Sequence, residues 1–340
     1  MKKILLFVNP LLQRTRARRR DIAGVLKVLR KSGAAIDILE TGENRAAGAK
    51  ARRAATQGYD AMLVCGGDGT IFDVIQGLAG STVPLGIIPF GTGNVMAQNL
   101  QLSRDPVEAA RRILASHPIR VPLGKITCCA PGGRQSWLFA MAAGMGVHAA
   151  LMSEARRSGK DTTGRAAYFV AGAKLLLNHP VQPFDVTITT TSGSVFEERV
   201  CEALAVRVAE LNRWRPGGGL NFPFLRLATV AGASRSRLAF ASYDALFRGG
   251  GGRDREQADN ASAIYRDAVR VVCRPIPDRS YKPSIAVQAD GEVLGVSCAT
   301  MEMAGLDVHL LSAADQHSSE CMSNRSGGTC GCFPVTTQAL

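Results

Sequence analysis

The first third of the chain alternates between short apolar runs and helical patterns, and this alternation restricts the fold more than any other feature. Apolar runs of strand length lie at 4–8, 36–39, 61–65 and 85–89. Amphipathic or alanine-rich segments of helical pattern follow them, at 16–32, 43–57, 70–79, 92–100 and 105–115. Alternation of this kind predicts an α/β domain whose parallel sheet is covered by helices on both faces.

From residue 119 onward the pattern becomes strand-rich, and threonine and valine dominate the apolar runs. A single helical pattern, at 164–178, interrupts these runs. The predicted strands are 119–124, 186–191, 202–208, 225–230, 237–242, 268–273, 285–289, 299–303 and 306–311. Many short strands with little helix between them favour an antiparallel β-sandwich or barrel as a second domain.

These two sequence patterns divide the chain into two domains and a tail. We predict an α/β domain over 1–124, to which a strand near 305–312 could return. A β-sandwich follows over 125–304 and contains a polar loop at 248–262. Residues 313–340 are rich in Ser, Gly and Cys without periodicity, so we expect a disordered tail there.

Charge and cysteine content restrict the partners and the compartment. Lysines and arginines number 41 against 28 acidic residues, a net charge of +13, which favours nucleotides, nucleic acid or acidic lipid as partners. The nine cysteines show no paired CxxC spacing, so reduced thiols of a cytoplasmic protein are expected. The longest uncharged stretch, 135–153, is broken by Gly144 and Gly146, and therefore predicts a strand, a glycine turn and a helix start rather than a membrane span.

Two glycine turns follow consecutive predicted strands. In the first, "GGDGT" at 66–70, backbone N–H groups can approach a phosphate, Thr70 can cap the following helix, and Asp68 beside phosphate implies a bridging Mg²⁺. The alternative is a plain strand-to-helix turn in which the aspartate is a cap. The second turn, "PFGTGN" at 89–94, offers the Thr92 and Asn94 side chains. Because ligands bind at the carboxyl ends of the strands, the two turns together predict one phosphate-binding crevice.

The spacing of these motifs resembles the diacylglycerol kinase catalytic-domain family, which includes soluble bacterial diacylglycerol kinases, related bacterial lipid kinases, and sphingosine and ceramide kinases. GGDGT followed by P-x-G-T-x-N carries the resemblance. Further similar stretches are "VNP" at 8–10, "AAGMGVHAAL" at 142–151, "GRAAYFVAGAKLL" at 164–176, "GGGLNFP" at 217–223 and "VQADGEVLG" at 287–295. No GxxxxGK[ST] motif is present, which excludes a P-loop NTPase.

The resemblance implies a first domain like those of phosphofructokinase and NAD kinase, and a β-sandwich that holds the lipid. It also implies phosphorylation of a lipid hydroxyl by ATP with Mg²⁺. Diacylglycerol, giving phosphatidic acid, is the expected acceptor, and sphingosine-type bases, phosphatidylglycerol and undecaprenol-like alcohols stay open as alternatives. Glu292 would accept the proton, Asp290 lies beside it, and Asp68 would bind the metal. The residues predicted to bind the nucleotide, from the resemblance and the two turns, are Asn9, Thr41, Gly66, Gly67, Asp68, Gly69, Thr70, Asp73, Gly91, Thr92 and Asn94. Without the resemblance, Asp290-Gly291 would be read as a hairpin turn, and both readings can hold.

Three departures from the family pattern bear on activity. Asn9-Pro10 continues as Leu-Leu-Gln instead of x-Ser-Gly, and the next residues include five arginines, at 14, 16, 18, 19 and 20. His148 stands where the family has an aspartate. The segment 232–241, "GASRSRLAFA", holds no carboxylate, so we predict that the structural metal site of many soluble bacterial relatives is absent.

Other functions stay open at this point. An NAD kinase could share the first domain, and a non-catalytic lipid- or nucleotide-binding relative could keep the whole fold. Nucleic-acid binding is suggested by charge alone, without a reader motif, so we expect no nucleic-acid partner. We expect a lipid substrate and peripheral association with an anionic membrane at its inner face. A homodimer is compatible with the sequence but is not indicated by it.

Overall fold

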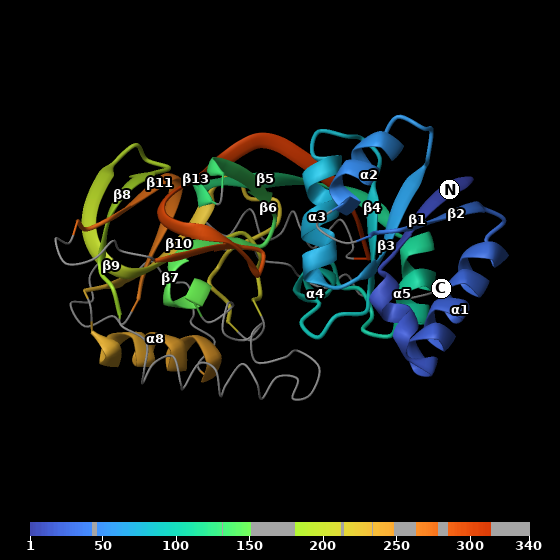
Figure 1. The fold of residues 1–340 in the computed structure, drawn as a ribbon, viewed down its shortest axis with the longest axis horizontal. Helices are drawn as coiled ribbons and strands as arrows, with labels where there is room; N and C mark the ends of the chain where they lie inside the picture. Colours follow the sequence, from blue (N-terminus) through green and yellow to red (C-terminus); the bar gives the residue numbers. More distant parts are fainter. Residues whose placement is uncertain are drawn as a thin grey trace, which may run out of the picture.

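The computed structural model describes residues 1–42, 46–130, 132–150, 181–211, 214–232, 234–247, 263–277 and 285–313. The predicted helix at 164–178, the loop at 248–262 and almost all of the predicted tail lie outside the described residues. Figure 1 shows two lobes side by side, with the N-terminal residues in one and most of the later strands in the other.

The first lobe contains four parallel strands in the order β4-β3-β1-β2. These strands are β1 (Lys3–Val8), β2 (Ala35–Glu40), β3 (Ala61–Gly66) and β4 (Leu85–Pro89). All residues of β3 and β4 are buried, as expected for central strands of a sheet covered on both faces. The carboxyl ends of β3 and β4 meet at one edge, where both glycine turns begin.

Helices follow the strands near the predicted positions. They are the short 3₁₀ helix η1 (Pro10–Arg14), α1 (Arg16–Lys31), α2 (Ala46–Ala54), α3 (Asp68–Leu78), α4 (Val95–Asn99) and α5 (Pro106–Leu114). The buried residues of α1 are Ile22, Val25 and Leu29, which lie on one face at helical spacing. Within the described ranges, no helix is both long enough and apolar enough to cross a membrane.

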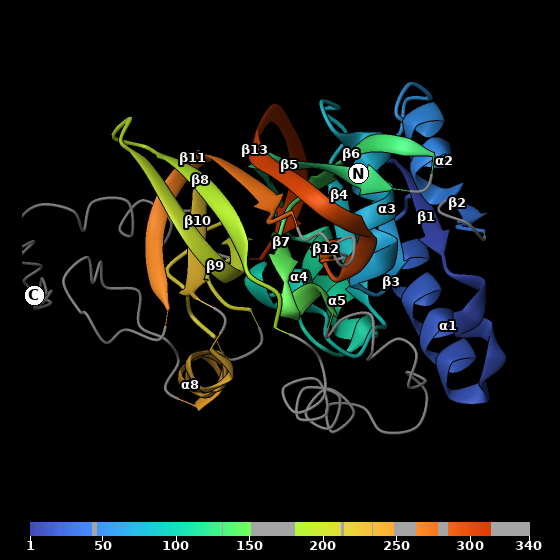
Figure 2. The same cartoon turned by 60° about the vertical axis from the view of Figure 1, so that its left-hand side comes forward.

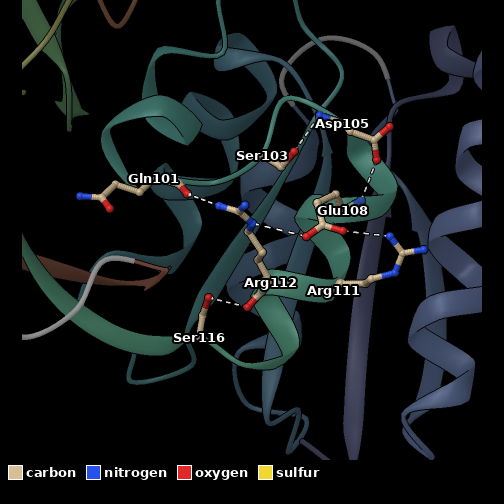
Figure 3. A network of polar contacts seen from close by, with 7 residues as sticks. All are labelled: Gln101, Ser103, Asp105, Glu108, Arg111, Arg112 and Ser116. Carbon is tan, nitrogen blue, oxygen red and sulfur yellow. Dashed lines mark hydrogen bonds and ion pairs between the residues drawn. The ribbon is translucent and has the colours of Figure 1, made fainter.

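The start of α5 shows how local sequence sets a helix boundary (Figure 3). The Asp105 carboxylate accepts a hydrogen bond from the Glu108 backbone N–H at 2.7 Å, and Pro106 occupies the first helical position. The Glu108 carboxylate in turn pairs with Arg111 at 2.9 Å and with Arg112 at 3.5 Å. The exposed face of α5 therefore carries charged side chains whose opposite charges balance one another.

The second lobe is built from antiparallel strands, with β10-β11-β8-β9-β7-β12-β13 as successive neighbours. Its β-rich character agrees with the sequence prediction. The strands are β5 (His117–Ala130), β6 (Gly133–Phe139), β7 (Ala142–Gly146), β8 (Phe184–Thr190), β9 (Val195–Val206), β10 (Leu225–Ala231), β11 (Ile264–Pro275), β12 (Ala286–Ala289) and β13 (Glu292–Ser312).

Strand β13 joins the two lobes into one sheet. Its end pairs in parallel with β4 through Leu310 and Leu85, while most of its length pairs with β5 in antiparallel register. The sequence predicted two strands, at 299–303 and 306–311, where the structure has one. The pairing shifts between Met303 and Asp307, and Gly305 takes a φ of 67°, so the apparent break is an irregularity within a continuous strand.

The predicted strand at 237–242 is wrong, because these residues lie in α8 (Arg235–Phe247). Leu238 and Ala241 both contribute to a small apolar cluster with Val230 of β10, and a spacing of three residues is helical. The run "RLAFAS" is too short for alternation to distinguish a strand from one helical turn. Figures 1 and 2 show α8 outside the strands of the second lobe.

Candidate active site

The two glycine turns are in direct contact at the carboxyl edge of β3 and β4. The Phe90 N–H donates to the Gly66 carbonyl at 2.9 Å, which continues the pairing of the strands. A Cβ atom on Gly91 would lie 2.8 Å from the Gly67 Cα, a separation that a side chain cannot adopt. Glycine is therefore required at position 91 for the turns to touch, and a Cβ atom on Gly67, 3.1 Å from the Gly91 Cα, would also be tight. The structure brings together the two motifs that the sequence placed at one crevice.

Asn9 connects the end of β1 to the first glycine turn. Its amide oxygen accepts the Leu11 N–H at 3.0 Å and begins η1, while its amide nitrogen lies 3.4 Å from the Thr70 hydroxyl. The prediction that Thr70 caps the following helix is wrong. Helix α3 starts at Asp68, with Gly67 as the N-cap residue and no side-chain capping bond. Thr70 is already inside the first turn, and its side chain faces Gly66.

Asp68 links the first turn to the second. Its carboxylate oxygens lie 3.3 Å from the Val95 N–H and 3.4 Å from the Met96 N–H, at the start of α4. These long hydrogen bonds orient the carboxylate toward the start of α4. A Cβ atom on Gly93 would lie 3.0 Å from Asp68 Oδ2. Asp68 thus sits between both turns, as a metal-binding carboxylate beside phosphates would have to.

Asn94 fixes the shape of the second turn. It has a φ of 49°, its side-chain oxygen accepts the Gly91 N–H at 2.8 Å, and its amide donates to the Gly91 carbonyl at 2.7 Å. Gln98 donates to the Gly93 carbonyl at 2.6 Å. The Asn94 amide is therefore used within the turn. Thr92, which is exposed, is the side chain at the tip of the turn.

Glu292 reaches the same site from the other end of the chain. Asp290 and Gly291 form a tight hairpin between β12 and β13, with φ values of 48° and 82° that are typical of a type I′ turn. Glu292 is the first residue of β13. Its Oε1 atom would lie 2.5 Å from a Cβ on Gly69, so the carboxylate lies against the first turn of α3. The hairpin brings a carboxylate against Gly69, the residue after Asp68 in the sequence, so the D-G-E stretch is both a hairpin and part of the candidate site.

Asp290 has a different environment from Glu292. It is 5% exposed, and its carboxylate accepts the backbone N–H groups of Ala140, Met141 and Ala142 at 2.8, 2.8 and 2.9 Å. Burial raises the pKa of Asp290 to about 6; the three N–H groups act in the opposite direction, and the nearby Asp68 carboxylate adds to the increase. These contacts make Asp290 an anchor that ties the hairpin to the β6–β7 connection.

Two predicted nucleotide-binding residues lie away from the glycine turns. Asp73 is buried in α3, and its carboxylate accepts the Ala47 N–H at 2.9 Å, near the start of α2. Thr41 follows β2 and is 4% exposed, with its N–H donated to the Val8 carbonyl at 3.0 Å. Asp73 therefore joins α3 to α2. Thr41 lies at the end of β2, and β1 separates it from β3 and the first glycine turn.

The junction behind the turns contains two polar residues that the sequence did not single out. The Asn99 amide donates to the Glu210 carbonyl at 2.7 Å and accepts the Glu210 N–H at 3.0 Å, which ties α4 to the segment after β9. Arg207 is 1% exposed and donates to the carbonyls of Phe222 and Phe224 at 2.9 and 3.0 Å. The sequence held one signal for Arg207: a charged residue interrupts the apolar run "EALAVRV", which indicates a buried residue with polar partners.

His148, at the position of the family's aspartate, is a packed residue. Burial lowers the pKa of its imidazole to about 4, so the ring is neutral. Its backbone N–H donates to the buried Glu202 carboxylate at 2.8 Å, and burial raises the pKa of Glu202 to about 8. Neither side chain lies among the groups that the two glycine turns bring together.

The chemistry of the site suits a magnesium–nucleotide complex. Across the part of the chain that the structure describes, no cluster of three or more His, Cys, Asp or Glu residues could hold a metal alone. Magnesium rarely needs such a cage, because it is commonly held by one or two carboxylates together with substrate phosphates and water. Asp68, at the first position of α3, supplies one such carboxylate.

The chain is similar to known diacylglycerol kinases in sequence and in fold. Residues 3–126 match the family model for the diacylglycerol kinase catalytic domain. A diacylglycerol kinase of Mycobacterium tuberculosis is 29% identical over 249 residues, covering 70% of this chain and 72% of that protein. One from Staphylococcus saprophyticus is 32% identical over 160 residues, covering 46% of this chain and 50% of that protein. A crystal structure of a putative diacylglycerol kinase from Bacillus anthracis shares the fold with a TM-score of 0.67 at 20% identity, covering 92% and 96% of the two chains.

Proposed function

Because residues 3–126 belong to the diacylglycerol kinase catalytic domain family, we propose that this chain is an ATP-dependent lipid kinase that phosphorylates diacylglycerol to phosphatidic acid. One observation carries the proposal beyond the first domain. The Glu292 carboxylate lies against Gly69, within the first glycine turn, although the two motifs are more than 200 residues apart in the chain (292 − 69 = 223). A proton acceptor at the phosphate-binding turns is what phosphoryl transfer to an alcohol requires.

In this proposal each group has one task. The backbone N–H groups of the two glycine turns bind the phosphates of ATP. The lipid hydroxyl oxygen forms a bond to the γ-phosphorus, the bond from that phosphorus to the bridging oxygen of ADP breaks, and the hydroxyl proton passes to the Glu292 carboxylate. Asp290 holds the hairpin that presents Glu292. Rate acceleration then comes mainly from positioning and charge stabilisation.

Asp68 is the residue that would hold Mg²⁺ in the site. The ion, when bound, neutralises charge on the phosphates and keeps them aligned for in-line transfer. Without a cation, the Asp68 carboxylate would repel the phosphates, since both are anionic. The position of Asp68 between the two turns supports this assignment.

Substitution of Glu292 by Gln tests the proposal. We expect ATP binding to persist, while turnover on diacylglycerol falls by roughly 10² to 10⁴, the usual contribution of a positioned base. Glu302→Gln is the matched control, because Glu302 lies on the same strand and pairs with Lys125 away from the turns. Wild-type turnover in Glu292→Gln would remove Glu292 from the mechanism.

The acceptor is assigned by a substrate panel. Diacylglycerol, a sphingosine-type base, phosphatidylglycerol and an undecaprenol-like alcohol are compared in an ADP-release assay, with NAD as a further acceptor. We expect turnover on diacylglycerol. Turnover on another lipid would change the substrate but keep the lipid kinase, and turnover on NAD alone would replace it with an NAD kinase.

A non-catalytic relative is the second candidate, and two observations favour it. Asn9 is followed by η1, which buries Leu12, instead of the family's Ser-Gly continuation. His148 is a packed neutral side chain where the family has a carboxylate. Binding of Mg·ATP and of lipid without ADP release on any acceptor would establish this candidate.

A further inference from the structure

Two cysteines from different strands place their sulfur atoms in contact at the surface of the second lobe. Cys129 of β5 and Cys298 of β13 have their Sγ atoms 3.2 Å apart. Cys129 is exposed and Cys298 is partly exposed. The other described thiols, Cys65, Cys128, Cys201 and Cys273, are all buried. Among the described cysteines, therefore, one pair is both mutually close and accessible to a small reagent.

An irregularity in the ladder between β5 and β13 creates this contact. Val296 lies opposite Cys129 and Ala299 lies opposite Cys128, so two residues of β13 have no partner between them. Ser297, the first of the two, has a φ of 75°, and its N–H is directed to the Ile285 carbonyl at 2.9 Å. The bulge brings the Cys298 thiol to the side of the ladder that carries Cys129. Cys128, the next residue, points into the apolar core.

We propose that Cys129 and Cys298 form an oxidisable dithiol site, which a peroxide or a low-molecular-weight disulfide converts reversibly into a disulfide bond. With a peroxide, each thiol loses one hydrogen, the two sulfurs share the new bond, and the peroxide is reduced to water and an alcohol, or to two waters from hydrogen peroxide. With a disulfide reagent, two of its thiols are released instead. A disulfide has a sulfur–sulfur distance of about 2.0 Å, so a side-chain movement of roughly 1 Å suffices.

The groups around Cys129 determine how reactive its thiol is. The pKa of the Cys129 thiol lies above its usual value, first because of its hydrogen bond to Cys298, then because of burial, while Arg134 opposite on β6 acts in the other direction. The Cys129 thiol is therefore not an activated nucleophile, and its oxidation requires reagent in excess. The bond would join β5 to β13 six residues after Glu292 (298 − 292), and it would fix the register of the bulge.

Peptide mapping of the full chain tests this site. The reduced protein is treated with excess hydrogen peroxide or oxidised glutathione, remaining thiols are alkylated, and the product is digested with trypsin and a glutamate-specific protease. We expect a cross-link between peptides 126–134 and 293–302 that is lighter than the sum of the two by two hydrogen atoms. The cross-link should disappear after treatment with dithiothreitol.

Three variants complete the test. Cys128→Ser removes the adjacent buried thiol and should retain the cross-link, whereas Cys129→Ser and Cys298→Ser should each abolish it. Circular dichroism of the reduced variants checks that each is folded. Alkylation of both Cys129 and Cys298 after oxidation would overturn the proposal. So would glutathione attached to Cys129 without a link to Cys298, or a cross-link that Cys128→Ser removes.

Discussion

At the scale of single residues, Asp68 and Glu292 should fail in different ways when neutralised. In Asp68→Asn the side chain keeps its size but loses the charge that a cation needs, so we expect weaker binding of Mg·ATP. Binding of metal-free ATP should not weaken, because the repulsion between the carboxylate and the phosphates is removed. Titration calorimetry with and without Mg²⁺ measures both. Asp185→Asn, at an exposed position of β8, is the control. Equal Mg·ATP affinity in Asp68→Asn and wild type would show that Asp68 does not hold the metal.

Glu202 gives a prediction about pH that is independent of catalysis. Its folded-state pKa, about 8, lies above the ordinary value of 4.5 because the carboxyl is buried. The folded protein therefore holds this proton more tightly than the unfolded chain, and the free energy of unfolding falls as pH rises from about 4.5 to about 8. Glu202→Gln cannot titrate. We expect the free energy of unfolding of Glu202→Gln, relative to wild type, to increase between pH 5 and pH 8.

Urea denaturation at several pH values measures the difference in the free energy of unfolding between Glu202→Gln and wild type. All other titrating groups are present in both proteins, so the pH dependence of this difference reports on Glu202. Each unit of pKa difference corresponds to about 1.4 kcal/mol. His148, whose backbone N–H the carboxylate accepts, stays neutral in the folded protein over this range because burial lowers its pKa to about 4. A difference between Glu202→Gln and wild type that does not vary with pH would contradict a raised pKa.

At the scale of secondary-structure elements, α2 and α3 pack through two glycines. A Cβ atom on Gly77 would overlap the Gly48 carbonyl oxygen, and one on Gly48 would lie 2.6 Å from the Asp73 carbonyl oxygen. Both obstacles are backbone atoms, which cannot rotate away. We expect Gly77→Ala to lower the free energy of unfolding by about 2 kcal/mol or more, despite the better helix propensity of alanine.

Gly24→Ala in α1 is the matched control for Gly77→Ala. Its added Cβ would meet a methyl group of Val107 at 2.8 Å, and a side chain can adjust. We therefore expect a much smaller loss, measured in the same denaturation experiment. Equal stability of both variants would show that the α2–α3 contact is looser than the structure indicates.

The elements also show why some of the fold was predictable from the sequence. The four parallel strands of the first lobe were found because each is a short apolar run followed by a helical pattern. The strand predicted at 237–242 failed because six residues cannot separate a strand from the helical spacing of Leu238 and Ala241. The contact between Glu292 and Gly69 has no signal in the local sequence, because it depends on how β13 crosses the molecule. The glycine turns predicted a phosphate-binding crevice, but only the family resemblance placed Glu292 in the site.

At the scale of the whole molecule, the two lobes share apolar and polar contacts. The core of the first lobe includes Ala140, Val206 and Val208 from the second, and β13 pairs with strands of both. Asn99 and Arg207 add hydrogen bonds at this junction. Because the junction lies directly behind the glycine turns, the position of Glu292 relative to Asp68 depends on packing between the lobes as much as on the hairpin itself.

The charge of the whole molecule leads to the final prediction, which concerns how the chain would reach the proposed lipid substrate in a membrane. Arg14, Arg16, Arg18, Arg19 and Arg20 are exposed, and no ion pair among the described residues involves them. Each such charge near an anionic leaflet contributes about 1 kcal/mol of attraction, which salt screens. We expect binding to acidic vesicles that falls steeply with salt, and Arg→Gln substitution at 16, 19 and 20 should weaken it.

Sedimentation with acidic and neutral vesicles at low and high salt measures this binding. Arg→Gln substitution at 111 and 112 is the control, since these arginines on α5 already pair with Glu108 (Figure 3). Removing them changes the net charge by two but leaves the five arginines between positions 14 and 20 intact. If the α5 variant lost as much binding per charge as the α1 variant, net charge alone would account for docking. Equal binding to neutral and acidic vesicles at both salt concentrations would instead leave insertion of apolar side chains as the route to the lipid.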